Sequence, residues 1–180
     1  NMDIFAHGLW TGALYKGVNR KVAKPFKVWQ AVFWGVFPDL FAFAVPLAGL
    51  IWNWTFDGLN FSDFPDPSKT EPPPPDTLWF FRLASFLYSI SHSLVIFVLV
   101  FGFVWLIRKQ PVWELGGWLL HILIDIPTHS YNFYPTPAFW PVSYWKFNGF
   151  SWGTPWFMIV NYSALVFVYF LLRKKKKTAK

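Results

Sequence analysis

Residues 78–107 read LWFFRLASFLYSISHSLVIFVLVFGFVWLI and are followed directly by Arg108 and Lys109. An α-helix needs about 20 mostly apolar residues to span the ~30 Å hydrocarbon core of a bilayer. This segment exceeds that length and carries one permanently charged side chain, Arg82, whose long stem can bring the guanidinium group to the membrane surface. The segment therefore predicts a membrane helix that ends at a basic flank.

The composition of the whole chain favours the same class of protein. Hydrophobic residues make up 54% of the 180 residues and charged residues 14%, whereas soluble domains carry about 25% charged residues. The absence of cysteine excludes disulfides, thiolate ligands and cysteine nucleophiles. We therefore predict a single all-α integral-membrane domain, residues 1–180, built as a polytopic helical bundle.

About four membrane helices and a half-length N-terminal helix are expected. The predicted ranges are 2–16 for the half-length helix, then 29–52, 78–107, 112–126 and 155–172. Pro38 and Pro46 predict a kink or break inside 29–52, because proline removes an intrahelical hydrogen bond. The acidic, proline-rich residues 53–77 and the aromatic residues 127–154 are expected to form outer loops.

Basic clusters lie beside the apolar segments. Residues 16–27, 108–109 and 173–177 contain most of the basic side chains behind the net charge of +7. Because Lys and Arg are enriched in cytoplasmic loops of membrane proteins, we expect the N-terminal basic segment and the C-terminus to be cytoplasmic. The prediction is a multi-pass protein of a bacterial or archaeal cytoplasmic (inner) membrane, with no nucleic-acid partner.

Ionisable side chains lie within or beside the apolar segments. Such groups are costly in the bilayer core unless they are paired, hydrated or metal-bound, and imidazoles and carboxylates are ligands that zinc prefers. At a rise of ~1.5 Å per residue from the basic flanks, His7, Asp39, His92 and His121 could share one layer near the bilayer midplane, with Asp125 one turn above His121. We predict one or two divalent ions, zinc or alternatively manganese, with five ligands: His7, Asp39, His92, His121 and Asp125.

The spacing of single residues adds detail to this prediction. His121 and Asp125 are four residues apart and share one helix face. Side chains that could support the ligands by hydrogen bonds are those of Asp3, Ser91, Ser93 and Thr128. The catalytic candidates, for bridging metals or transferring protons, are Asp39, Asp125 and His129. Each pattern also has a simpler interpretation: a hydrogen-bonded histidine, a local side-chain pair, or, for Asp3, a helix cap.

The order of these motifs resembles a family of bacterial inner-membrane metal-dependent hydrolases of the LexA-regulated type, and is distantly similar to zinc-dependent phospholipase C. The matching stretches are Met2–His7, Phe37–Asp39, Ser91–Ser93, His121–Thr128 and Trp140–Ser143. The resemblance implies that the five residues named above are metal ligands. The family has an acidic residue two positions after its Pro-Asp pair, and this chain has Phe41 there.

The expected function is hydrolysis of a phosphate ester in a lipid or another amphiphilic substrate that enters from the membrane. A zinc-type ion lowers the pKa of a bound water to near 7 and polarises a phosphoryl oxygen, which activates the water for attack. Two other classes remain open. Broken helices with polar residues at mid-membrane also occur in carriers, and a non-catalytic subunit could use His92 and His121 as haem ligands.

Overall fold

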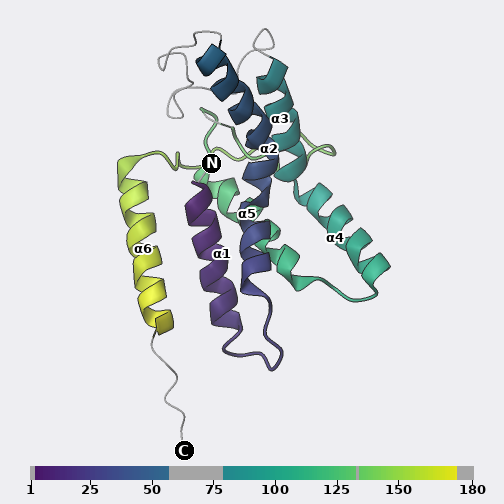
Figure 1. Ribbon diagram of the computed structural model, residues 1–180, viewed down its shortest axis with the longest axis vertical. Coiled ribbons are helices and arrows are strands. Elements are labelled where there is room, and N and C mark those ends of the chain that lie inside the picture. The colour runs from purple at the N-terminus through teal and green to yellow at the C-terminus, as the bar shows by residue number, and fades with distance from the viewer. Residues whose placement is uncertain (1–2, 57–78, 133, 174–180) are drawn as a thin grey trace, which may run out of the picture.

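The computed structural model describes residues 3–56, 79–132 and 134–173, and these residues form helices joined by loops (Figure 1). The all-α prediction is confirmed for this part of the chain. The elements are α1 (Ile4–Val18), α2 (Val28–Phe56), α3 (Trp79–Ser91), α4 (Leu94–Arg108), the 3-10 turn η2 (Trp113–Leu115), α5 (Gly116–Thr128) and α6 (Pro155–Arg173).

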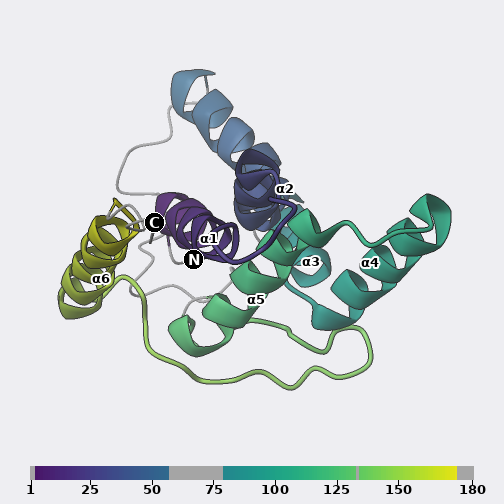
Figure 2. The same ribbon diagram turned by 90° about the horizontal axis from the view of Figure 1, so that it is seen from below.

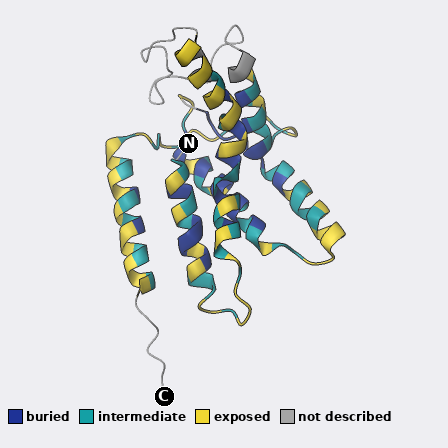
Figure 3. Ribbon diagram, in the orientation of Figure 1, coloured by how far each residue is buried: buried dark blue, intermediate teal, exposed yellow. Residues whose placement is uncertain are grey.

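Two of the described helices, α2 and α6, are long and apolar enough to cross a membrane, and the bent pair α3–α4 makes a third if it is one span. The expected number of four membrane helices is not confirmed. The segment 112–126 forms η2 and α5, and α5 has only 13 residues, fewer than the about 20 that a span needs. Large apolar side chains on α6, such as Ile159 at 68% and Val166 at 71%, are exposed (Figure 3), as expected for a surface covered by lipid.

The prediction of one continuous helix over 78–107 is wrong, because the chain breaks at His92 and Ser93. The helices on either side of this break meet at a bend of 59°. Ser93 has an extended backbone, and its hydroxyl accepts hydrogen bonds from the amides of Val95 and Ile96 as the N-cap of α4. The amide of Leu94 donates to the carbonyl of Ala138, 2.8 Å away. A serine cap and a loop carbonyl thus replace the hydrogen bonds that the break removes.

Of the kink or break predicted at Pro38 and Pro46 inside 29–52, the break does not occur. Both prolines lie inside α2, which continues from Val28 to Phe56. This helix packs against α1, α3 and α5, and Figure 2 shows α1, α2 and α5 side by side at the centre of the molecule. Packing on several sides offsets the hydrogen bonds lost at the prolines.

Glycines let these three helices approach closely. A Cβ atom on Gly117 of α5 would lie 2.1 Å from the carbonyl oxygen of Ala31, and one on Gly35 of α2 would lie 2.3 Å from the hydroxyl oxygen of Thr11. Any larger residue would push α5 or α1 away from α2. The glycines therefore determine how near the side chains of α1 and α5 come to those of α2.

The loop after α5 is tied to the end of that helix. The amides of Gly149 and Phe150 donate to the carbonyls of His129 and Pro127, at 2.7 and 2.9 Å. These bonds fix the backbone of His129, the residue that ends α5. Of the other predicted loop, 53–77, residues 53–56 belong to α2 and the rest lie outside the described residues.

Candidate metal centre

All four histidines of the chain come together with two aspartates. Asp39, His92, His121, Asp125 and His129 have no exposed surface, and His7 is 1% exposed. They come from α1, from α2, from the break between α3 and α4, from α5 and from the residue that ends α5. The five predicted ligands thus converge, and His129 joins them.

Four of these residues have the geometry of a metal site. Asp39, His92, His121 and Asp125 each offer a ligand atom, and these atoms all lie within 4.8 Å of one another. Zinc bonds of 2.0–2.2 Å in a tetrahedral site would place neighbouring ligand atoms about 3.3 Å apart. The observed separations are close to this value. The Nε2 atoms of His92 and His121 lie 3.0 Å apart, each 3.2 Å from Oδ2 of Asp125, and 3.6 and 3.7 Å from Oδ1 of Asp39.

Backbone carbonyls set the tautomer of the two imidazoles. Nδ1 of His121 lies 2.7 Å from the carbonyl oxygen of Gly35, and Nδ1 of His92 lies 3.2 Å from that of Tyr88. A carbonyl oxygen only accepts, so Nδ1 of His121 carries the hydrogen and donates it. Nδ1 of His92 does the same when the Ser91 hydroxyl, 2.9 Å from it, accepts from the ring and donates to the carbonyl of Tyr88. Each Nε2 then presents a lone pair to the centre of the cluster, which is how metal-bound histidines are usually held.

The centre therefore gathers electron-pair donors that need a positive charge between them. Two neutral imidazole nitrogens 3.0 Å apart repel each other unless a proton or a metal ion lies between them. Protonating the imidazoles is a poor solution, because the rings of His7 and His121 are stacked with centroids 3.7 Å apart and two cations in that arrangement would repel. A divalent ion balances the two carboxylates without this cost.

His7 and His129 approach the other carboxylate oxygen of Asp125. Their Nε2 atoms lie 3.0 and 3.5 Å from its Oδ1 atom. Nδ1 of His129 donates to the carbonyl of Tyr134 at 2.6 Å, so His129 also points a lone pair at the cluster. Asp125 is thus the one carboxylate, among the described residues, that lies near all four imidazoles.

Three of the four residues expected to support the ligands hold either a ring or the backbone near it, and Asp3 does not. The hydroxyl of Ser91 lies 2.9 Å from Nδ1 of His92. Ser93 donates to the carbonyl of Trp140 at 2.5 Å, and Thr128 donates to that of Ile124 at 2.8 Å. Asp3 caps α1 by accepting a hydrogen bond from the amide of Ala6 at 2.9 Å, and it accepts another from the hydroxyl of Tyr162 at 2.7 Å. These contacts agree with the simpler interpretation of Asp3 as a helix cap.

Sequence reasoning missed three groups that orient the histidines. Tyr88 stacks on His92 with ring centroids 3.8 Å apart and donates to the carbonyl of Tyr134 at 2.9 Å. Its position one helical turn before His92 could have indicated this contact. The carbonyls of Gly35 and Tyr134 have no comparable signal, because their roles depend on helix packing and on the positive φ of 42° at Tyr134.

Phe41 stands where the resembling family has an acidic residue, and it lies away from the cluster. Its ring is 39% exposed and packs on Phe37, with centroids 5.5 Å apart. Residues two apart on a helix do not face the same way. A carboxylate at this position on α2 would therefore point away from Asp39, and its absence does not remove a ligand from the cluster described here.

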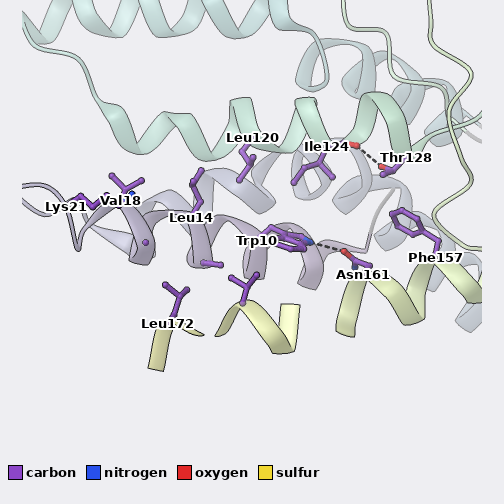
Figure 4. A pocket seen from close by; sticks show the side chains of 13 residues that line it. Trp10, Leu14, Val18, Lys21, Leu120, Ile124, Thr128, Phe157, Asn161 and Leu172 are labelled. Carbon is purple, nitrogen blue, oxygen red and sulfur yellow. Dashed lines mark hydrogen bonds between the residues drawn. The ribbon is translucent and has the colours of Figure 1, made fainter. Parts of the chain in front are cut away.

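An apolar cavity lies on the other side of α1 and α5. It has a volume of about 670 Å³ and lies between α1, α5 and α6 (Figure 4). Leu120 and Ile124 on its wall each precede a metal-ligand candidate in α5, and Lys21 lies at one end (Figure 4). Asn161 accepts from the indole nitrogen of Trp10 at 2.8 Å, while its own Nδ2 has no hydrogen-bond partner.

Comparison of the chain with protein-family models, with curated proteins and with solved structures found no match. The resemblance to the inner-membrane hydrolases therefore stays a prediction from the sequence motifs. The chemistry of this cluster must be argued from its own geometry.

Proposed function

We propose that this chain is a membrane-embedded, metal-dependent hydrolase that cleaves a phosphate ester in a lipid or another amphiphilic molecule. The observation that carries the proposal is the buried group of Asp39, His92, His121 and Asp125, with ligand atoms within 4.8 Å of one another. When bound there, a zinc-type or manganese ion would activate a water molecule and polarise a phosphoryl oxygen.

The side chains of the cluster then have separable roles. His92 and His121 hold the ion through Nε2, and Asp125 binds it and balances the charge of the imidazoles. Oδ1 of Asp39 lies 3.6 and 3.7 Å from these nitrogens, farther than the 3.2 Å of Asp125. Asp39 is therefore our candidate to accept the proton of the attacking water as general base. The water oxygen would bond to phosphorus as the ester P–O bond breaks, and the leaving alcohol would take up the proton that Asp39 removed from the water.

The surroundings of the cluster favour an amphiphilic substrate. The cavity of about 670 Å³ is within the 300–1,000 Å³ range of ligand pockets, and its wall is made mostly of apolar side chains that suit an acyl or isoprenyl chain. None of the six cluster residues lines it, and α1 and α5 separate it from the cluster, so it would hold the apolar part of the substrate and not the phosphate. The candidate membrane spans α2 and α6 flank α1. We propose a bacterial or archaeal cytoplasmic membrane as the location, with the basic segment after α1 and the C-terminus on the cytoplasmic side.

A metal carrier is the second candidate, and the break between α3 and α4 favours it. The 59° bend lies at His92, and broken helices with polar residues at the break are typical of transporter sites.

A haem group bound by His92 and His121 is disfavoured by the geometry of the cluster. Oδ2 of Asp125 is equally distant, 3.2 Å, from Nε2 of His92 and of His121. It therefore lies in the plane midway between them, where a macrocycle with two axial histidines would have to lie.

Hydrolysis of a lipid panel tests the proposal. The detergent-purified protein, loaded with zinc or manganese, is incubated with phospholipids and isoprenyl phosphates, and released phosphate or head group is measured. We expect at least one lipid to be cleaved, and Asp39→Asn to lose most of that activity. The control variant Glu114→Gln alters a carboxylate that accepts from the amide of Lys27, and it should remain active. A panel left intact, together with metal flux into proteoliposomes, would establish the carrier instead.

A further inference from the structure

We propose that the cluster binds a second divalent ion through His7, His129 and Oδ1 of Asp125, so that Asp125 bridges two ions. This inference rests on the proposed function, because the first ion is the one held by His92, His121 and Oδ2 of Asp125, with Asp39 beside it. It adds a second site to that centre and makes it dinuclear.

The two oxygens of Asp125 face different pairs of imidazoles. Oδ2 lies 3.2 Å from Nε2 of both His92 and His121, whereas Oδ1 lies 3.0 Å from Nε2 of His7 and 3.5 Å from that of His129. Each set of separations is close to the ~3.3 Å expected between neighbouring ligands of a zinc-sized ion. A carboxylate that offers one oxygen to each of two ligand pairs has the arrangement of a metal bridge.

The atoms on the His7 side have no other partner. Nε2 of His7, Nε2 of His129 and both oxygens of Asp125 are buried and make no hydrogen bond, although each of these two nitrogens lies within 3.5 Å of Oδ1 of Asp125. Since Nδ1 of His129 donates to Tyr134, its Nε2 lone pair faces the lone pairs of a carboxylate. Buried polar atoms without partners are costly, and one cation would satisfy both Nε2 atoms and Oδ1 of Asp125. Nδ1 of His7 is also buried without a hydrogen-bond partner.

Both sites have the ligand number of a catalytic zinc centre. Each has three protein ligands, as in catalytic zinc sites that keep a position for water, and Asp39 lies beside the first site as the candidate general base. Two ions in one centre can hold the attacking and leaving oxygens of a phosphoryl group in line. Two divalent ions against two carboxylates also leave an excess of positive charge, which favours an anionic phosphate as substrate.

Manganese titration followed by electron paramagnetic resonance tests the second site. Metal-stripped, detergent-purified protein is titrated with Mn²⁺ alone, and bound ions per chain and the spectrum are recorded. We expect two ions per chain and a spectrum with exchange coupling between them. His7→Ala and His129→Ala should each bind one ion and give the six-line spectrum of isolated Mn²⁺. Ser130→Ala, which changes a buried hydroxyl next to His129, is the matched control and should still bind two.

The possible results distinguish a failure of the second metal site from a failure of the proposed hydrolase function. A wild type that binds one uncoupled ion overturns the second site and leaves the hydrolase proposal standing. Two ions retained in folded His7→Ala and His129→Ala also overturn it. A wild type that binds no Mn²⁺ overturns both proposals. If the variants fail to fold, the wild-type stoichiometry and coupling decide alone.

Discussion

At the scale of single residues, hydrogen bonds to the backbone determine what the histidines can bind. Nδ1 of His92, His121 and His129 each lies within 3.2 Å of a backbone carbonyl oxygen. Their Nε2 atoms are thereby directed at Asp125. The sequence predicted the ligand residues from their placement in apolar segments, and the spacing of His121 and Asp125 predicted one shared face. It did not reveal the carbonyl partners, which come from other helices and from a loop.

The two aspartates should differ in their importance for metal binding. Asp125 approaches all four imidazoles, whereas Asp39 approaches only His92 and His121, and at longer distances. We expect Asp125→Asn to abolish zinc binding. Asp39→Asn should weaken zinc binding by at least the roughly 10–100-fold that loss of an outer hydrogen-bond partner causes. Zinc titration of each metal-stripped variant measures this. Equal losses in the two variants would mean that Asp125 is not the central ligand.

At the scale of helices, the apolar segments and their basic flanks predicted most helix positions. The half-length helix expected at 2–16 is found at Ile4–Val18, and that expected at 155–172 is Pro155–Arg173. The break at His92 was missed, because 78–107 is apolar on both sides of it and Ser93 is as compatible with a helix as with a cap. The helix expected to end at 126 continues through Pro127 to Thr128 and brings His129 to the cluster.

The contact between α2 and α5 should depend on Gly117. A Cβ atom there would lie 2.1 Å from the carbonyl oxygen of Ala31, so Gly117→Ala must move α5. Because His121 is one turn further along α5 and binds Gly35 of α2, metal affinity should fall as well. We expect a loss of about 1–3 kcal/mol in the free energy of unfolding, typical of overpacking, with weaker zinc binding.

The matched control is Gly102→Ala in α4. A Cβ atom on Gly102 has no neighbour within 4 Å, and alanine is the better helix former by up to about 1 kcal/mol. Denaturant unfolding and zinc titration of both variants give the comparison. A Gly117→Ala variant as stable and as tightly zinc-binding as Gly102→Ala would show that close packing of α2 and α5 does not position the cluster.

At the scale of the whole molecule, the cluster is where the elements of the bundle meet. Its ligands come from α1, α2, the break after α3, α5 and the loop that follows α5. An alignment of helix depths predicted that these residues could share a layer, but depth alone does not determine which helix faces which. The close contacts at Gly35 and Gly117 determine which helices face each other. The residues opposite these glycines can be identified only from the three-dimensional packing. The composition of the chain predicted a membrane protein. The number of membrane spans was predicted from the lengths of the apolar segments, and these lengths overestimate the lengths of the helices.

Metal content of the purified protein tests the metal centre most directly. Zinc and manganese per chain are measured by mass spectrometry on detergent-purified wild type, on the double variant His121→Ala/Asp125→Ala and on Glu114→Gln. We expect at least one ion per chain in the wild type and in Glu114→Gln, and none in a double variant that remains folded. A metal-free wild type that also fails to bind added zinc or manganese would contradict the metal centre and the hydrolase function proposed from it.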